Sequence, residues 1–233
     1  MKAMILAAGH GTRMRPLTDH TPKPLLKAGG KSLIVWHIEK LKKAGFQDII
    51  INIAWLGDQI PEALGDGSRF GVNLFYSDEQ KDGALETAGG IIKALPLLTS
   101  KGDADKEPFL VTNGDVWCDY QYQNKNPLKD GKLAHLILVN NPPHNPQGDF
   151  ALLQNQLVTD YADNHKNEKI TFSGIGYYHP DLFKNLEQGK RPLAPLLRAS
   201  MNNSKVTGEL FNGDWRDIGT PERLADLNTK LQQ

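Results

Sequence analysis

Glycines and basic side chains gather directly after the first apolar stretch of the chain. The run Ala3 to Ala8 is small and apolar. Two glycines and three basic residues follow within fifteen residues, namely Gly9, Gly11, Arg13, Arg15 and Lys23. Backbone N–H groups of a flexible loop can wrap a phosphate chain, and arginine and lysine neutralise its charge. The stretch therefore predicts a phosphate-binding loop.

The spacing of this loop matches neither of the two best-known phosphate-binding motifs. A dinucleotide fingerprint requires a third glycine where Met14 stands, and the glycine-lysine signature of a P-loop is absent. A plain surface loop is the alternative interpretation. Pro22 and Pro24 argue against it, because prolines on both sides of Lys23 fix the backbone around one cation.

Two aspartates further along the chain suggest a metal ion beside the phosphates. Asp115 follows an apolar strand in "TNGDVW", and Asp217 lies in "GDWRDIGTPERL", before a helix capped at Thr220. Taken alone, each is compatible with a turn or cap residue. Together they form the hard oxygen ligand set that Mg²⁺ takes when phosphates and water supply its other positions. Cations for phosphates and carboxylates for magnesium indicate phosphoryl chemistry.

The elements that must position these residues alternate between short apolar runs and segments of helical period, which is typical of an α/β fold with a mostly parallel sheet. Strands are expected near residues 3–7, 48–54, 71–77 and 108–115, and helices over 33–44, 55–64 and 87–98. The second half predicts strands at 133–139, 148–153, 170–179 and 205–211, one helix at 192–202 between them, and an exposed connection at 121–132. We expect one domain over 1–233 with two lobes, 1–120 and 121–233, of which the second is the substrate-facing portion of the same sheet.

Composition limits the partners of the protein. The 233 residues contain 27 Lys and Arg and 27 Asp and Glu, which gives no reason to expect a nucleic acid or a membrane surface as a partner. The single cysteine, Cys118, excludes an internal disulfide and is expected to be a packed thiol. His37 on an apolar helix face is expected to be a satisfied or edge histidine and not a ligand. No stretch has the length or apolarity of a membrane helix or a signal peptide, so a cytoplasmic location is expected. No obligatory protein partner is evident.

The motif "LAAGHGTRMRPLTDHTPKPL", with Asp115 and Asp217 downstream, strongly resembles the sugar-1-phosphate nucleotidyltransferases along essentially the whole chain. The resemblance implies a Rossmann-like fold with a smaller sugar-binding lobe, with 1–120 mainly the nucleotide-binding half and 121–233 mainly the sugar-binding half. It also implies a nucleoside triphosphate and a sugar 1-phosphate as substrates, and Mg²⁺ on Asp115 and Asp217. It assigns catalysis to these two aspartates together with Arg13 and Lys23. The nucleotide would contact Ala7, Ala8, Gly9, Gly11, Thr12, Arg13, Met14 and Lys23.

Other side chains are weaker candidates for recognising the base and the sugar. Glu79 and Glu86 are candidates for the base pocket, although a glutamate at a helix start is equally well explained by the helix dipole. We expect Asn113, Asp149, Ser173 and Gly174 to face the sugar. Many relatives carry a Glu-Lys-Pro sequence whose lysine contacts the sugar phosphate. This chain has none, because neither Lys166 nor Lys169 is followed by proline.

Within the family, stretches such as "AWLGDQI", "LGDGSRFG" and "TFSGIGYYHPDLF" are most similar to the N-acetylmuramate-1-phosphate uridylyltransferases of cell-wall sugar recycling. This implies transfer of a uridylyl group from UTP to N-acetyl-α-muramate 1-phosphate, with release of pyrophosphate. The mannose-1-phosphate guanylyltransferases share "TAGG" and much of the ending, so guanylyl transfer, or transfer to another sugar 1-phosphate, is the nearer alternative. A non-catalytic regulator that binds a nucleotide sugar is the farther one.

Overall fold

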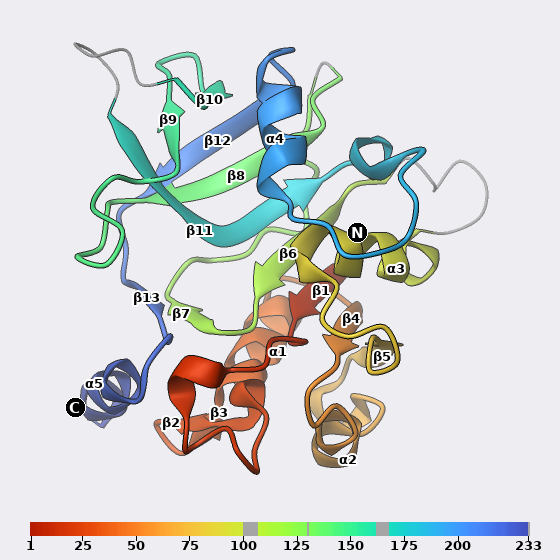
Figure 1. Cartoon of the computed structure of the whole chain (residues 1–233), viewed down its shortest axis with the longest axis vertical. Helices are drawn as coiled ribbons and strands as arrows, with labels where there is room; N and C mark the ends of the chain where they lie inside the picture. Colours follow the sequence, from red (N-terminus) through yellow and green to blue (C-terminus); the bar gives the residue numbers. More distant parts are fainter. Residues whose placement is uncertain (100–106, 130, 162–167, 233) are drawn as a thin grey trace.

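The computed structural model describes residues 1–99, 107–129, 131–161 and 168–232. Across these residues, nine strands form one sheet with the order β10-β9-β11-β6-β1-β4-β5, while β8 pairs with β11 and β12. Two small sheets, β13-β7 and β2-β3, lie beside it. Figure 1 shows the strands of the two chain halves in one continuous layer, with helices against it. The α/β fold with helices flanking a central sheet is therefore confirmed.

The first half contains the parallel part of the sheet. The strands β1 (Ala3–Leu6), β4 (Asp48–Ile53), β5 (Asn73–Asp78) and β6 (Phe109–Asn113) run parallel. Successive side chains of a strand point to opposite faces. Ile5 accordingly packs on the side of α1 (Leu33–Lys43), and Met4 packs on the side of α3 (Glu86–Leu98). Both faces are buried, which explains the almost continuous apolar runs in the sequence.

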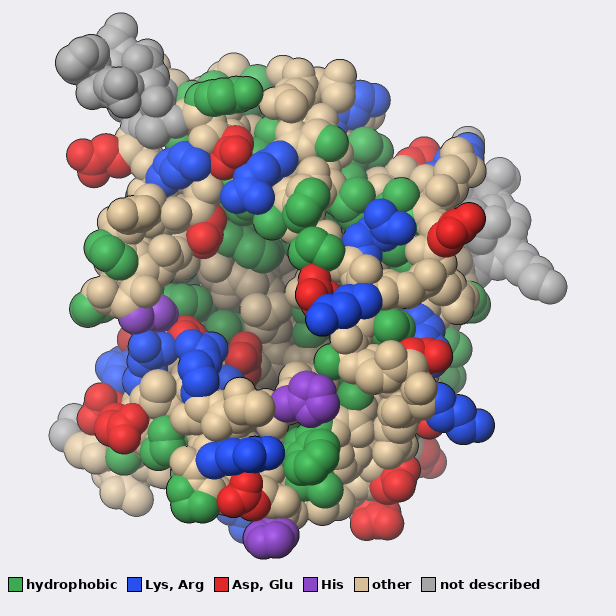
Figure 2. All heavy atoms as spheres, in the orientation of Figure 1, with side chains coloured by type: hydrophobic (Ala, Val, Ile, Leu, Met, Phe, Trp, Pro, Cys, Tyr) green, Lys and Arg blue, Asp and Glu red, His purple; other side chains and the backbone are tan. Residues whose placement is uncertain are grey.

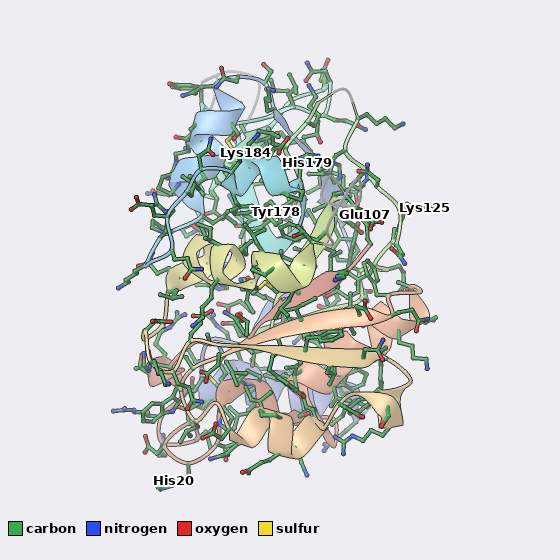
Figure 3. All side chains as sticks on the ribbon, turned by 90° about the vertical axis from the view of Figure 1, so that its right-hand side faces the viewer. His20, Glu107, Lys125, Tyr178, His179 and Lys184 are labelled. Carbon is green, nitrogen blue, oxygen red and sulfur yellow. The ribbon has the colours of Figure 1, made fainter. Side chains whose placement is uncertain are left out.

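The second half extends this sheet with antiparallel pairs. The long strand β11 (Lys169–Tyr178) runs antiparallel to β6, β8 (Ala134–Val139) and β9 (Phe150–Leu152), and β10 (Val158–Thr159) completes that edge. The strand β12 (Val206–Phe211) pairs in parallel with β8, and α4 (Ala194–Met201) packs on the same core as α3. Figure 3 labels Tyr178 at the end of β11, on the face that α3 covers.

A third cluster ties the end of the chain to its beginning. The strand β13 (Trp215–Asp217) pairs with β7 (Val116–Cys118), and α5 (Pro221–Leu231) follows it. Leu224 and Leu227 of α5 bury against Ala28, which belongs to the hairpin β2 (Lys27–Ala28) and β3 (Lys31–Ser32). Thr220 caps α5 by accepting a hydrogen bond from the N–H of Arg223, as its sequence predicts.

One expectation about local structure is wrong, and a second holds except at one residue. The helix expected from Trp55 begins only with α2 (Gln59–Leu64), because Leu56 has a positive φ of 51° and breaks the helical conformation. The connection expected to be exposed at 121–132 contains the buried Tyr122, whose hydroxyl lies 2.9 Å from Nδ1 of His37 and 3.1 Å from Oγ1 of Thr112. The buried Tyr122 side chain holds the segment against the core, although its sequence neighbours are polar.

Cys118 is buried, as expected, and His37 is a satisfied histidine that lies in the core and not at its edge. His37 is buried, and its Nε2 lies 2.8 Å from the carbonyl oxygen of Val116. In the described part of the chain, no helix combines the length and the apolar character that a membrane span needs.

Candidate active site

The first cavity opens at the carboxyl ends of β1, β4 and β6. In an open α/β sheet this is where ligands bind. The cavity has a volume of about 220 Å³ and is lined by Leu6, Ala7, Ala8, Gly9, Lys23, Pro24, Asn52, Glu79, Ala84, Glu86, Thr87, Asn113 and Asp115. Figure 2 shows a hollow in the middle of this face, with basic and acidic side chains around its rim. Residues far apart in the sequence thus meet where the glycine-rich loop was expected to bind phosphate.

Lys23 and Asp115 form an ion pair in this cavity. Lys23 Nζ lies 2.8 Å from Asp115 Oδ2, and the Lys23 side chain is 9% exposed against 38% for Asp115. Lys23 begins a short 3-10 helix, Lys23–Leu25, and Pro22 and Pro24 hold its backbone on both sides. The sequence predicted both residues as site residues, but it did not predict their contact. The pair presents one cation and one carboxylate to any phosphate that enters.

Gly11 and Gly9 contribute differently to the glycine-rich loop. Gly11 allows its backbone conformation, and Gly9 leaves space beside it. Gly11 has a φ of +62°, and a Cβ there would lie 2.9 Å from Thr18 Cγ2 and 3.3 Å from Lys23 Cβ. The hydroxyl of Thr18 donates to the carbonyl oxygen of Gly11 over 2.8 Å and closes the loop. A Cβ at Gly9 would meet nothing within 4 Å. Gly11 therefore fits the loop against Lys23, while Gly9 leaves room for a ligand.

The rest of the loop divides between exposed and buried side chains. Thr12, Arg13 and Met14 form a short 3-10 helix. Thr12 and Arg13 are exposed, and Arg13 stands outside the residues that line the first cavity. Met14 is fully buried in the cluster with Trp117, so its side chain supports the loop and does not face the cavity, contrary to expectation.

A buried polar pair forms the back of the cavity. Asn52 Oδ1 accepts a hydrogen bond from the N–H of Ala7 over 2.8 Å, and Asn52 Nδ2 donates to Glu79 Oε1 over 2.7 Å. The N–H of Leu85 donates to Glu79 Oε2 over 3.1 Å, and burial raises the pKa of Glu79. Sequence reasoning missed Asn52, although a polar residue inside the apolar run "DIIINIA" is a signal that points to it.

Glu86 and Thr87 stand between this cavity and a second one. Both residues line both cavities, and so does Asn113. Glu86 starts α3 with a positive φ of 61°, and its carboxylate lies 3.5 Å from Lys190 Nζ. The expected helix-start position of Glu86 is therefore confirmed. A ligand that fills both cavities passes these three side chains.

The second cavity, of about 440 Å³, lies between the β9–β11 edge and α4. Besides the three shared residues, it is lined by Asp149, Phe150, Phe172, Pro192, Leu193, Ala194, Leu197 and Arg198. The Asp149 carboxylate accepts a hydrogen bond from the N–H of Phe172 over 2.8 Å and one from Asn145 Nδ2 over 3.3 Å. Asn113 and Asp149, both expected to face the sugar, thus line one cavity, and Arg198 joins them without a sequence signal.

The two other residues expected at the sugar lie behind the cavity walls. Ser173 is fully buried, and its hydroxyl donates to the carbonyl oxygen of Ile137 over 2.7 Å, so its side chain does not face a sugar. The physical reason is strand alternation: Phe172 lines the cavity, and the residue next to it on β11 points to the opposite face. Gly174 has a φ of +81°, and a Cβ there would lie 2.6 Å from Asn113 Nδ2. Gly174 therefore makes room for Asn113.

Asp217 lies next to Asp115 along the backbone but faces a third cavity. It pairs with Val116 in the β13–β7 ladder, and the N–H of Ile218 donates to the carbonyl oxygen of Asp115 over 2.9 Å. The Asp217 carboxylate lies 2.6 Å from Arg223 Nη1 and 3.3 Å from His144 Nε2, and these three residues line the third cavity. The sequence did not predict His144 and Arg223 as site residues, because no local motif indicates that they contact Asp217.

The donor set is compatible with one magnesium ion shared with phosphates. Within the described residues, no group of three or more His, Cys, Asp or Glu side chains is arranged to hold a metal by itself. Asp115 directly precedes β7, and Asp217 pairs with Val116 of β7. Mg²⁺ usually takes one or two carboxylates and leaves its other positions to water and phosphate oxygens. Lys166, considered above for the sugar phosphate, lies outside the described residues. Lys169, the other lysine considered, has its Nζ 3.0 Å from Asp160 Oδ1.

Comparisons with known proteins agree with this geometry. The family model described as "Nucleotidyl transferase" matches residues 2–233. N-acetylmuramate alpha-1-phosphate uridylyltransferase of Neisseria meningitidis is 52% identical over 231 residues, which cover 97% of this chain and 96% of that protein. The beta catalytic subunit of mannose-1-phosphate guanylyltransferase from Xenopus tropicalis is 37% identical over 95% of this chain, which spans 62% of that protein. The solved structure of CTP:phosphocholine cytidylyltransferase from Streptococcus pneumoniae has a TM-score of 0.73 at 22% identity and covers 99% of this chain and 98% of its own.

Proposed function

This chain belongs to the nucleotidyl transferase family, and we propose that it transfers a uridylyl group from UTP to N-acetyl-α-muramate 1-phosphate, releasing pyrophosphate. The observation that carries this proposal is the 52% identity to the Neisseria uridylyltransferase, over 97% of this chain and 96% of that protein. The guanylyltransferase is a more distant relative, at 37% identity and with a longer chain. Two cavities that share Glu86, Thr87 and Asn113 supply the space that a nucleotide and a sugar require.

The reaction needs no general base on the protein. A phosphate monoester loses its second proton at about pH 6, so the sugar phosphate oxygen is ionised at neutral pH and attacks the α-phosphorus of UTP directly. Bringing two polyanions together is the main barrier, which positive charge and positioning lower. In our proposal Lys23 binds the phosphoryl group in transfer, at the floor of the first cavity. Arg13, exposed on its short helix, neutralises the departing pyrophosphate.

We assign the binding of Mg²⁺ to Asp115 and Asp217. When bound, the ion neutralises phosphate charge and orients the reacting groups. The protein prepares these two carboxylates in different ways. Lys23 holds Asp115 over 2.8 Å, and Arg223 holds Asp217 over 2.6 Å. Each cation limits the electrostatic repulsion between the carboxylates and restricts the rotamers of the aspartate that it contacts.

The nucleotide and the sugar are assigned to the two cavities. Backbone groups of Ala7 to Thr12 border the triphosphate, and the hydrogen bond from the N–H of Ala7 to Asn52 Oδ1 holds the start of this loop in place. Glu79 and Glu86 line the first cavity and are our candidates for recognising the base, while Asn113 and Asp149 face the sugar from the second. We place the enzyme in cell-wall sugar recycling and in the cytoplasm, because UTP is made there and N-acetylmuramate is a sugar of the bacterial cell wall.

Pyrophosphate release by the purified protein with Mg²⁺ tests the proposal. UTP, GTP, CTP and dTTP are each combined with the 1-phosphates of N-acetylmuramate, N-acetylglucosamine, glucose and mannose. The proposal predicts release with UTP and the muramate sugar, and a product with the mass of UDP-N-acetylmuramate. Release with GTP and mannose 1-phosphate in its place identifies a guanylyltransferase, and no release with any pair indicates a protein that binds nucleotide sugars without turnover.

A further inference from the structure

The lining of the second cavity contains more acidic than basic side chains. Two carboxylates, Glu86 and Asp149, and one guanidinium, Arg198, belong to its lining in the described part of the chain. Glu86 is paired with Lys190, and Asp149 accepts hydrogen bonds from Phe172 and Asn145. An anionic group on the bound sugar is repelled by the two carboxylates, so Arg198 is the lining residue that can accommodate it.

Among the described residues, Arg198 uses its Nε in an ion pair and belongs to a group with a net positive charge. Its Nε donates to Asp160 Oδ2 over 3.0 Å, and Asp160 Oδ1 accepts from Lys169 Nζ over 3.0 Å. Two cations thus share one carboxylate, which leaves the group Arg198, Asp160 and Lys169 with a net charge of +1. Partial burial raises the pKa of Asp160, but the hydrogen bonds from Lys169 and Arg198 outweigh this and leave the pKa below its ordinary value. Asp160 is therefore ionised, and the guanidinium still carries four N–H groups on its two Nη atoms.

The sugar of the proposed reaction has one anionic group besides its phosphate. N-acetylmuramate differs from N-acetylglucosamine only by a lactyl ether, which carries a carboxylate and a methyl group. Near Arg198 the cavity also presents apolar surface, because the guanidinium lies 5.8 Å from the ring centre of Phe150 and Leu197 precedes it on α4. A cation beside an apolar wall matches the two parts of the lactyl group.

We propose that Arg198 binds the lactyl carboxylate and so selects muramate sugars over their glucosamine counterparts. This inference rests on the proposed function and adds to it the residue that discriminates between the two sugars. Arg198 contacts neither the phosphate nor the nucleotide in this arrangement, because it lines the second cavity and not the first. Its effect on affinity is therefore confined to sugars that carry the lactyl group.

Calorimetry with the variant Arg198→Met tests this role. Dissociation constants for N-acetylmuramate 1-phosphate and N-acetylglucosamine 1-phosphate are measured with a non-hydrolysable UTP analogue and Mg²⁺ present. Loss of a charged hydrogen bond weakens binding by about tenfold or more. We expect this loss for the muramate sugar, so that the variant binds the two sugars with dissociation constants within about threefold of each other. The preference of the wild-type protein for the muramate sugar must also decline as the salt concentration rises.

Further variants separate this role from a structural one. Arg198→Lys keeps the charge without the forked geometry and should restore part of the preference. Arg69→Met is the matched control, since Arg69 lies on another short helix, Ser68–Phe70, and lines none of the three cavities. Melting temperatures of all variants show whether they are folded. Equal weakening for both sugars, or a preference unchanged in Arg198→Met, contradicts the proposal. Failure of the wild-type protein to use UTP with the muramate sugar contradicts the proposed function instead.

Discussion

Lys23 Nζ lies 2.8 Å from Asp115 Oδ2, so a cation of the glycine-rich motif contacts the carboxylate in the turn that follows β6. These residues are 92 positions apart in the chain, and the parallel pairing of β1 with β6 brings their segments together. The contact brings the glycine-rich motif and Asp115, our proposed metal ligand, into one cavity. Our account of catalysis depends on this arrangement.

The first prediction concerns Lys23. Lys23→Ala should reduce kcat about a hundredfold, a loss on the order of 3 kcal/mol of transition-state stabilisation, because a preorganised charge at the transferring phosphoryl group is removed. Steady-state pyrophosphate release measures the effect. The exposed Lys27 of β2 gives a matched control, Lys27→Ala. Turnover by Lys23→Ala at the level of this control would remove Lys23 from the mechanism.

The second prediction concerns the proposed metal ligands. Asp115→Asn and Asp217→Asn should each weaken Mn²⁺ binding in the presence of UTP at least tenfold, measured by electron paramagnetic resonance, because an amide replaces a charged oxygen ligand. Asp119→Asn, at an exposed aspartate near β7, serves as the control. If either variant bound Mn²⁺ as tightly as the control, that aspartate would not be a ligand.

The third prediction separates the roles of Gly9 and Gly11. Gly11→Ala places a Cβ at a φ of +62° and 2.9 Å from Thr18 Cγ2, so the free energy of unfolding should fall by at least about 1 kcal/mol. Gly9→Ala should leave the unfolding free energy nearly unchanged, because its Cβ meets nothing within 4 Å, and should instead raise the KM for UTP. Denaturant unfolding of both variants provides the comparison. Equal losses of stability would mean that Gly9 also shapes the loop.

The fourth prediction follows from His37 beneath β7. Burial, together with the nearby charge of Lys40, lowers the pKa of His37 to about 4, whereas an unfolded histidine keeps its ordinary value of 6.5. Between these two pH values the unfolded chain binds the proton and the folded protein does not. Stability should therefore fall as the pH decreases from 6.5 towards 4, with His37 contributing up to about 3 kcal/mol of the loss.

The variant His37→Gln isolates this contribution. It should be less stable at pH 7, because it disturbs the contacts with Tyr122 and Val116, but it should lose less stability on acidification than the wild-type protein. His20→Gln, at an exposed histidine, should behave like the wild type. Parallel acid-dependence curves for wild type and His37→Gln would show that other groups cause the decline.

Much of the fold could be predicted from the sequence because its signals are local. The buried strands β1, β4 and β6 are short apolar runs, and α1 and α5 carry helical periodicity with recognisable starts. The prediction of a helix from Trp55 was wrong because Leu56 adopts a positive φ. Leucine rarely has this conformation, so the sequence does not indicate it. The burial of Tyr122 was not predicted, because the residues around it are polar and indicate an exposed segment.

The site could be predicted where a residue acts through its place at the end of a strand or in a tight loop. Lys23, Asp115, Asn113 and Gly11 belong to this group. Arg198 could not be predicted from its position in the sequence. Its proposed role depends on the packing of α4 against β9 and β11, which are distant in the chain and form the cavity with it. Ser173 follows Phe172 on β11, so its side chain points away from the second cavity, which the sequence did not indicate.

The measurement that tests the central claim most directly compares specificity constants. The purified protein is assayed with Mg²⁺ for UTP with N-acetylmuramate 1-phosphate and for GTP with mannose 1-phosphate, and the products are identified by mass. We predict that kcat/KM for the first pair exceeds that for the second by at least about a thousandfold, which corresponds to roughly 4 kcal/mol of transition-state discrimination. Equal or greater efficiency with GTP and mannose 1-phosphate would contradict the account.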